Sequence, residues 1–232
     1  MCIVVYVNAN SDEYNALLEE ESMSTSAKFK VRPSPLADVP TGAGAGRLRI
    51  LEAAVRSFIR DGGAAFSARG VAKEAKMSLG AVQHFFPTKE QLLAAMLEHV
   101  VADFRRAFER LETELPYNGE ARLLAVIDYL VADAWKPDSR KFFFNFYALS
   151  CHNAFAAELL NNTYAHHRHR LAAYIGAARP HLSEQECFDL ALQLVALTEG
   201  LMVYTAPGAR SVTPRQHLAE TTRETVLRML AK

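Results

Sequence analysis

The stretch from Ser67 to Lys89, SARGVAKEAKMSLGAVQHFFPTK, constrains the fold of this chain more than any other stretch, because its pattern predicts two short helices joined by a tight turn. The hydroxyl of Ser67 can cap the first helix, and that of Ser78 can cap the second. Val82 and Phe86 lie one helical turn apart and form the buried stripe of the second helix. This is the geometry of a helix-turn-helix, which can enter a DNA groove.

The outward face of the second helix is the candidate surface for reading DNA bases. In a helix-turn-helix, the N-terminal part of the second helix presents its side chains to base edges in the major groove. With the capping serine included, the candidates for base readout are Ser78, Leu79, Gly80, Ala81, Gln83 and His84.

Four segments of this region occur in an order and at a spacing that resemble a known family. RLRILEAAVRSFIRDGG resembles the first helix of the TetR family of bacterial transcriptional regulators, SARGVAKEAKMS its second helix and turn, GAVQHFF its recognition helix, and PTKEQLL the start of its fourth helix. The similarity covers Arg47 to about Leu97. It implies an all-α protein, in which an N-terminal three-helix helix-turn-helix domain precedes a C-terminal helical bundle for ligand binding and dimerisation.

Two positions depart from the pattern of the family. Lys76 stands where the family usually has a glycine that is often left-handed, so we expect mild backbone strain there. Gln83 stands where the family often has a tyrosine that contacts a phosphate. Gln83 can either bond a phosphate or reach the edge of an adenine.

Positive charge is concentrated around the motif, although the whole chain has a formal net charge of +0. Residues 47–89 carry eight Lys or Arg against three acids, which gives +5, while residues 1–46 sum to −3 and residues 90–232 to −2. This favours binding to phosphates, and the alternative is an ordinary solvated basic face. The candidate phosphate contacts are Ser67, Arg69, Phe85 and Lys89, the last at the positive N-terminus of the following helix.

The composition divides the chain into three parts: a disordered N-terminal extension and linker at 1–46, a DNA-binding domain at 47–90 and a helical domain at 91–232. The linker sequence VRPSPLADVPTGAGAG has little ability to pack. The apolar run CIVVYV is too short for a signal peptide or a membrane span, so we expect no membrane association. Two alternatives remain here, a true start at Met23 and a basic arm from Lys28 to Arg32 that touches DNA.

Helical periodicity continues on both sides of the motif. A helix that ends at Gly62-Gly63 should pack on the motif through Leu48, Leu51, Val55, Phe58 and Ile59. Thr88 and Gln91 form a capping box for a long fourth helix that runs to about Leu115. About five further helices follow, and we see no alternating strand pattern of useful length.

The aromatic-rich segment from Trp135 to Tyr164 predicts either a ligand pocket or a plain core. The family resemblance implies a small-molecule pocket here and along the fourth helix. The nominated lining residues are Phe104, Trp135, Phe143, Phe146, Tyr147 and Tyr164, with Thr198 and Glu199 as polar groups. Aromatic residues around Glu199 would suit a cationic ligand.

The last two helices, about Glu184 to Tyr204 and Pro214 to Leu230, carry regular apolar stripes. LTEGLMVY resembles a stretch often found in the dimer-forming helix of the family. The stripes predict either burial within one subunit or a homodimer interface, and a homodimer would read the two half-sites of a pseudo-palindromic operator. The candidate interface residues are Leu190, Leu194, Leu197, Leu201, Leu218, Thr222 and Val226.

Signs of enzymatic chemistry are weak. His166, His167 and His169 do not share one helical face, so we expect no metal site. We find no nucleotide-binding or hydrolase motif, and we therefore expect no catalytic residues, no enzymatic activity and no cofactor. Three cysteines make no disulfide framework and fit a reducing cytoplasm.

Together these patterns predict a cytoplasmic, nucleoid-associated repressor that binds a double-stranded DNA operator as a homodimer. An unknown small-molecule effector would release it from the DNA. Two alternatives are a redox sensor that responds through Cys151 or Cys187, and a DNA-binding dimer without an effector.

Overall fold

The computed structural model of the protein describes residues 44–115, 119–204 and 215–231. The expected disorder of the N-terminal extension, the alternative start at Met23 and the basic arm from Lys28 to Arg32 lie outside these residues. The first described helix begins at Ala45, two residues before the predicted domain boundary.

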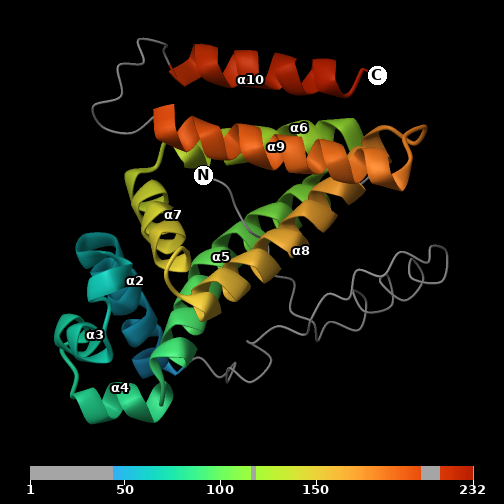
Figure 1. Ribbon diagram of the computed structural model, residues 1–232. Coiled ribbons are helices and arrows are strands. Elements are labelled where there is room, and N and C mark those ends of the chain that lie inside the picture. Colours follow the sequence, from blue (N-terminus) through green and yellow to red (C-terminus); the bar gives the residue numbers. More distant parts are fainter. Residues whose placement is uncertain (1–43, 116–118, 205–214, 232) are drawn as a thin grey trace. The chain divides into compact units, whose positions relative to one another are not determined.

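Every regular element among the described residues is a helix (Figure 1), which confirms the all-α prediction. The helices are α2 (Ala45–Ala65), α3 (Ala68–Ala75), α4 (Leu79–Phe85), α5 (Lys89–Glu114), α6 (Gly119–Ala134), α7 (Pro137–Ser150), α8 (Ala154–Ala178), α9 (Glu184–Tyr204) and α10 (Arg215–Met229).

The described chain forms two compact units, and the division between them passes inside α5, α7 and α8. We call residues 44–103 and 145–166 the N-terminal unit, and the remaining described residues the C-terminal unit. The N-terminal unit is therefore larger than the predicted helix-turn-helix domain. It includes the end of α7 because the Asn145 side-chain amide donates a hydrogen bond to the Phe58 carbonyl at 2.8 Å.

The core of the N-terminal unit is built around Phe58 of α2, which is fully buried. Its ring meets the ring of Phe66 edge to face at 5.4 Å and that of Phe146 at 5.8 Å. The predicted inward stripe of α2 is wrong at Leu48, which is 43% exposed, whereas Ile50 is fully buried. The buried face follows the spacing of Ile50, Ala53, Ala54 and Phe58 and leaves Leu48 on the opposite side.

The two glycines near the end of α2 interrupt this helix without ending it. Gly62 has a φ of 79°, yet the helix continues to Ala65. Gly63 allows a close approach, because a Cβ there would lie 2.8 Å from the Cβ of Leu149. The helical backbone therefore breaks at the predicted pair of glycines, and a short helical segment follows as far as Ala65.

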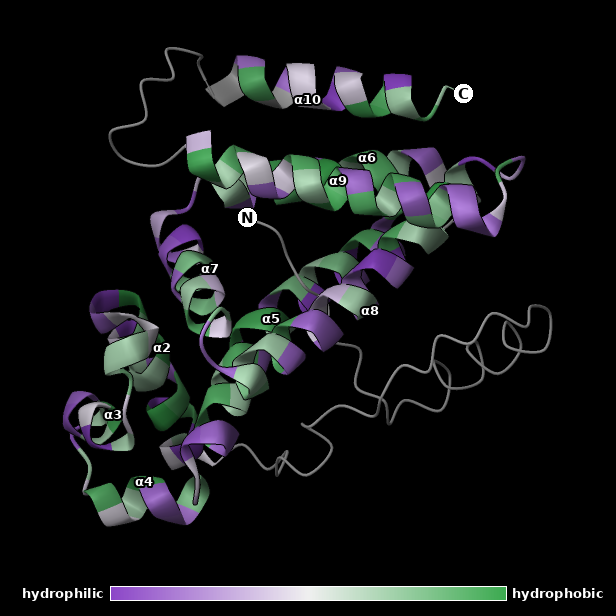
Figure 2. Ribbon diagram, viewed as in Figure 1, coloured by the Kyte–Doolittle hydropathy of each residue, from purple (hydrophilic) through white to green (hydrophobic). Residues whose placement is uncertain are grey.

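In the C-terminal unit, α6, α9 and α10 run side by side (Figure 1) and α6 packs against both of the others. The core residues Ile127, Leu130, Met202 and Val226 from these helices are each at most 1% exposed. Apolar residues extend along most of α9, and hydrophilic ones gather at its start (Figure 2). By length and composition α9 could also cross a membrane, but a core helix of a bundle has the same composition.

The turn after α3 gives the first testable prediction. Lys76 has φ 54° and ψ 45°, the left-handed conformation that costs a residue with a Cβ about 1 kcal/mol and costs glycine little. Replacing Lys76 by glycine should raise the free energy of unfolding in urea by about 0.5–1 kcal/mol.

The matched control for this substitution is Lys73→Gly, because Lys73 is exposed in the last helical turn of α3. Glycine inside a helix should lower the free energy of unfolding by about 1 kcal/mol. A loss of stability in Lys76→Gly comparable to that of the control would contradict the assignment of strain.

Candidate functional site

The first helix of the predicted motif, α3, is capped as the sequence indicates. The Ser67 hydroxyl accepts a hydrogen bond from the Gly70 N–H at 3.2 Å. Val71 and Ala75 are buried on the inward face at 0% and 4% exposure. The cap and the buried face together fix where α3 begins and how it is rotated on α2.

The turn between α3 and α4 is held by a residue that the sequence analysis missed. Arg49 of α2 donates from Nε to the carbonyl of Ala75 at 3.0 Å and from Nη2 to the carbonyl of Lys76 at 3.1 Å. These carbonyls lie at the end of α3, where a helix leaves its last acceptors without partners. Local sequence patterns could not reveal the contact, because Arg49 precedes the turn by more than 25 residues.

The second helix, α4, presents the predicted readout face. The Ser78 hydroxyl accepts from the Ala81 N–H at 3.1 Å, while Val82 and Phe86 are buried at 0% and 2% exposure. On the outer side Gly80, Gln83 and His84 are exposed, as Ser78 is, whereas Leu79 and Ala81 are half-buried. All six readout candidates thus keep at least part of their surface accessible.

The four phosphate candidates differ in what they offer. Ser67, Arg69 and Lys89 are exposed, and Lys89 is the first residue of α5. Phe85 is half-buried, its ring lies next to Gly46, and its side chain has no hydrogen-bond donor. Among these four, Arg69 and Lys89 have side chains that can neutralise a phosphate charge.

The start of α5 forms the predicted capping box. The Thr88 N–H donates to Oε1 of Gln91 at 3.3 Å, and the Gln91 N–H donates to the Thr88 hydroxyl at 3.1 Å. The two bonds satisfy donors that would otherwise lack partners and fix the helix start beside Lys89.

Part of the positive charge is neutralised within the N-terminal unit. Arg56 and Arg60 of α2 both bind Glu74 of α3, at 3.0 and 2.6 Å, and Arg60 also pairs with Asp61. Hydrogen bonds from Arg60 and Arg56 lower the pKa of Glu74, which stays ionised. The basic side chains that pair with no acid among the described residues of this region include Arg69, Lys73, Lys76 and Lys89.

The nominated pocket residues are divided between the two units. Phe104, Trp135, Phe143, Thr198 and Glu199 belong to the C-terminal unit, and Phe146, Tyr147 and Tyr164 to the N-terminal unit.

In the N-terminal unit, Phe146 packs on Phe58 and is part of the core. Tyr147 and Tyr164 stack at 6.2 Å, their hydroxyl groups are hydrogen-bonded to each other, and burial raises the pKa of both.

Two of the C-terminal nominees also pack as core residues. Phe104 meets Tyr129 edge to face at 5.7 Å, and Phe143 is fully buried. The Thr198 hydroxyl donates to the carbonyl of Leu194 at 2.9 Å. Glu199 differs from these, because burial raises the pKa of its carboxyl to about 8, so the group is mostly protonated at neutral pH.

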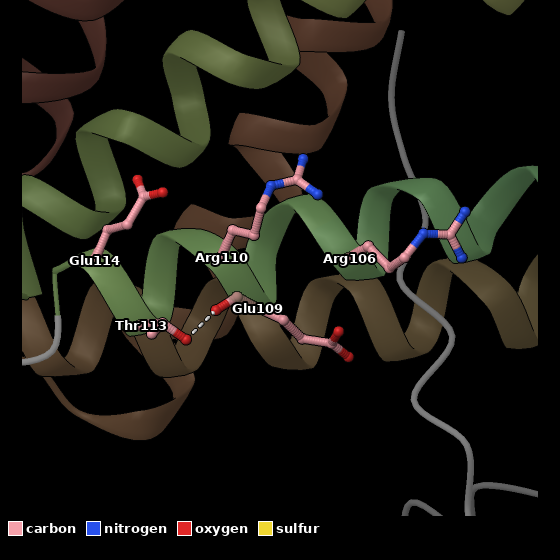
Figure 3. A pocket seen from close by; sticks show the side chains of 5 residues that line it. All are labelled: Arg106, Glu109, Arg110, Thr113 and Glu114. Atoms are coloured by element: carbon pink, nitrogen blue, oxygen red, sulfur yellow. Dashed lines mark hydrogen bonds between the residues drawn. The ribbon is translucent and has the colours of Figure 1, made fainter.

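A surface groove of about 340 Å³ lies along α5 and contains none of the nominated residues. Figure 3 shows its five lining residues, all from this helix: Arg106, Glu109, Arg110, Thr113 and Glu114. Small-molecule sites are mostly apolar and enclosed, whereas this groove is open and charged.

The predicted dimer stripe lies largely inside the subunit. Leu194, Leu201, Thr222 and Val226 are at most 7% exposed within the single chain, so they already have apolar partners. Leu190, Leu197 and Leu218 are half-buried. The apolar side chains that α9 leaves open are Leu192, Val203 and Tyr204, which are 52%, 57% and 67% exposed. The more buried side of the stripe faces the subunit's own core.

The two described cysteines differ in accessibility. Cys151 is exposed, while Cys187 is buried and burial raises the pKa of its thiol. The described residues contain no cluster of three or more His, Cys, Asp or Glu side chains that could hold a metal ion.

Comparison with known proteins gives two family matches. Residues 50–96 match the family described as bacterial regulatory proteins, tetR family, and residues 119–231 match the BetI-type transcriptional repressor, C-terminal. The chain is 28% identical over 156 residues to the HTH-type transcriptional regulator BetI of Burkholderia cenocepacia, covering 67% of this chain and 79% of that protein. It is also 44% identical over 54 residues to the regulator PksA of Bacillus subtilis, covering 23% of this chain and 26% of PksA.

Solved structures show the same fold. A transcriptional regulator from Pseudomonas aeruginosa has a TM-score of 0.70 at 20% identity, covering 84% of this chain and 95% of that one. A regulator from Saccharomonospora viridis in complex with choline has a TM-score of 0.59 at 24% identity, covering 80% and 95%. With a capped helix-turn-helix at 67–86 and a BetI-type C-terminal region, this chain belongs to the TetR family of bacterial transcriptional regulators and is not an enzyme.

Proposed function

We propose that the protein is a dimeric, ligand-responsive repressor that binds a pseudo-palindromic operator through α4 and leaves it when a small molecule binds the C-terminal region. The observation that carries this proposal is the outer face of α4, where Gln83 and His84 are exposed while Val82 and Phe86 anchor the helix. A rigidly seated helix with open polar side chains is suited to direct readout in the major groove. Such a regulator acts in the cytoplasm, where the nucleoid lies.

The division of roles on the interface follows from side-chain chemistry. Gln83 can make two hydrogen bonds to an adenine edge, and His84 next to it can donate or accept. Lys89 and Arg69 are charged and contact phosphates, which position the protein without reading sequence. Lys89 is aided by the positive end of the α5 dipole.

Dimerisation is supported by the large apolar side chains that α9 leaves exposed. Leu192, Val203 and Tyr204 leave large apolar surfaces in water. A two-fold contact through this face would bury them and bring the half-buried Leu197 to the interface as well. A dimer also places two recognition helices on successive half-sites, which multiplies affinity.

Effector binding is supported by the relative that was solved with choline and by the chemistry of Glu199. A quaternary ammonium ion is held by carboxylates and by aromatic rings. Attraction to such a cation would offset the cost of ionising the half-buried carboxyl of Glu199, which is the cost that raises its pKa to about 8. Choline is therefore the first compound to test. By linkage, an effector that prefers the low-affinity conformation weakens operator binding by the same coupling energy, typically about 1–3 kcal/mol.

Accessibility favours Cys151 over Cys187 for the redox alternative. A sensor thiol must be reachable by the oxidant. Operator release by peroxide that is lost in Cys151→Ser and retained in Cys187→Ser would support this second function in place of the first.

Substitutions at Lys89 and Gln83 should affect DNA binding in different ways. Lys89→Ala removes a phosphate contact and should weaken binding to specific and unrelated DNA by a similar factor, and it should reduce the salt dependence by about one charge. Gln83→Ala removes a base contact. It should weaken binding to the preferred operator by about 1–3 kcal/mol, and it should weaken binding much less on operators that are altered at the base pair that Gln83 contacts. Gel-shift titrations at fixed salt measure both.

Lys73→Ala provides the matched control, because Lys73 is also an exposed lysine of the motif but is not a predicted phosphate contact. It should change operator affinity much less than Lys89→Ala. Equal weakening by the two lysine substitutions would contradict a specific phosphate contact at Lys89, and uniform weakening by Gln83→Ala would contradict base readout.

The effector prediction is that choline lowers operator affinity by about 5–150-fold, the usual range of such coupling. Glu199→Gln keeps the size of the side chain and removes its charge, so this variant should bind the operator normally and lose the response. Titration of the preformed DNA complex with choline measures the effect. A response that persists in Glu199→Gln excludes this carboxyl from the site, and no response to choline or to a wider set of metabolites would favour the dimer without an effector.

The raised pKa of Glu199 also predicts how stability depends on pH. The folded protein holds the proton up to about pH 8, whereas the unfolded chain releases it near pH 4.5. The contribution of Glu199 to the free energy of unfolding is therefore fully present below about pH 4.5 and is lost as the pH rises towards 8. Over this range the free energy of unfolding of the wild type should fall relative to that of Glu199→Gln. Parallel pH profiles in urea titrations would contradict the burial of this carboxyl.

A further inference from the structure

His167 of α8 is buried without a hydrogen-bond partner. Its side chain is 0% exposed, and within the part of the chain that the structure describes neither ring nitrogen has a donor or acceptor in reach. A buried polar group without a partner destabilises the folded state. An arrangement with this cost calls for a physical reason.

The contacts of His167 restrict where a hydrogen-bond partner could lie. The imidazole stacks nearly parallel on the ring of Phe108, with centroids 6.4 Å apart and planes 19° apart. Phe108 in turn meets Tyr129 and Tyr174 edge to face. Because the two ring nitrogens lie on the edge of the imidazole, a partner must approach in the plane of the ring, beside this aromatic cluster.

The polar groups around Phe108 are already engaged with one another. Arg170 donates from Nε to the carboxylate of Glu112 at 3.0 Å and to the hydroxyl of Tyr174 at 2.8 Å. Its guanidinium also lies 5.6 Å from the centre of the Phe108 ring. His167 takes no part in this network, and both of its ring nitrogens are without a hydrogen-bond partner among the described residues.

The charge state of His167 limits what it can bind. Burial, followed by the positive charges of Arg170 and Arg168, lowers the pKa of the imidazole to about 3. At neutral pH the ring therefore offers one donor and one acceptor and carries no charge. A cationic group placed directly against the imidazole would be repelled by the same two arginines. A metal ion would need further ligands, and the described residues contain no cluster of three or more His, Cys, Asp or Glu side chains that could supply them.

We propose that His167 is a hydrogen-bonding subsite of the effector pocket and takes an uncharged hydroxyl or amide group of the effector, the kind of group that choline also carries. The proposal rests on the ligand-responsive function proposed above and adds the class of chemical group that the effector presents. In the free protein the imidazole is held ready without a partner, and the aromatic cluster supplies the apolar wall next to it.

The first test needs no knowledge of the effector. His167→Phe fills the same space with an aromatic ring and removes the two unpartnered nitrogens, so the free protein should melt about 2–4 °C higher or more. His169→Phe is the matched control, because His169 lies on the same helix, is half-buried and packs against Phe188. It should leave Tm nearly unchanged. Because a phenyl ring is larger than an imidazole, His167→Leu serves as a second variant that is closer to histidine in volume. A lower Tm for both variants, with His169→Phe unchanged, would show that the imidazole has a structural partner and would overturn the proposal.

The second test uses phenol and toluene as probes, since they have similar shapes and only phenol has a hydroxyl. Calorimetric titration and thermal shift of the full chain should show phenol binding to the wild type at least tenfold more tightly than toluene. His167→Phe should remove this preference, and His167→Gln, which retains a donor and an acceptor, should restore part of it. Equal binding of the two probes to the wild type, or no binding of phenol, would overturn the subsite.

A gel shift separates this proposal from the proposed function. Wild type and His167→Phe should both bind operator DNA, because His167 belongs to the C-terminal unit and the DNA-binding motif to the N-terminal unit. If neither binds DNA while phenol selectivity depends on His167, the operator function fails and the subsite stands. If both bind DNA and phenol selectivity is absent, the subsite fails and the operator function stands.

Discussion

The hydrogen bonds from Arg49 to the carbonyls of Ala75 and Lys76 are the contact on which the DNA-binding surface depends. They tie α2 to the point where α3 ends and the chain reverses into α4. Lys76 is in a left-handed conformation there without the freedom of glycine. The guanidinium of Arg49 therefore helps to stabilise a turn that the backbone of Lys76 disfavours. The direction of α4, and with it the placement of Gln83 and His84, follows from this turn.

Around that turn the N-terminal unit is stabilised by packing and by charge pairing together. Phe58 contacts aromatic rings on both sides, and Arg60 binds Glu74 of α3 at 2.6 Å. Exposed ion pairs contribute little on their own, so the aromatic core supplies most of the stability and the ion pairs fix the registry of α2 on α3. The lysines left unpaired, such as Lys89, then remain available to phosphates.

In the C-terminal unit, two polar groups differ from the aromatic core residues around which the sequence predicts a pocket. The sequence nominated aromatic residues, and several of them, such as Phe143, are ordinary core. Glu199 and His167 stand apart, because burial keeps the carboxyl protonated and leaves the imidazole neutral and unpartnered. An unpartnered imidazole such as that of His167 reduces the stability of the free protein, and departures of this kind occur mainly at functional or strained sites.

The local elements could be predicted from the sequence. The caps at Ser67 and Ser78, the box of Thr88 with Gln91 and the order of the helices depend on residues three or four apart, whose interactions are nearly independent of the rest of the chain. Features that depend on residues far apart in the sequence could not be predicted, because they follow from how the helices pack. Arg49 meets a turn more than 25 residues away, Phe146 joins the core around Phe58, and Leu194 faces its own subunit while Leu192 does not. A periodic stripe shows that a helix has an apolar side, but packing decides what covers that side.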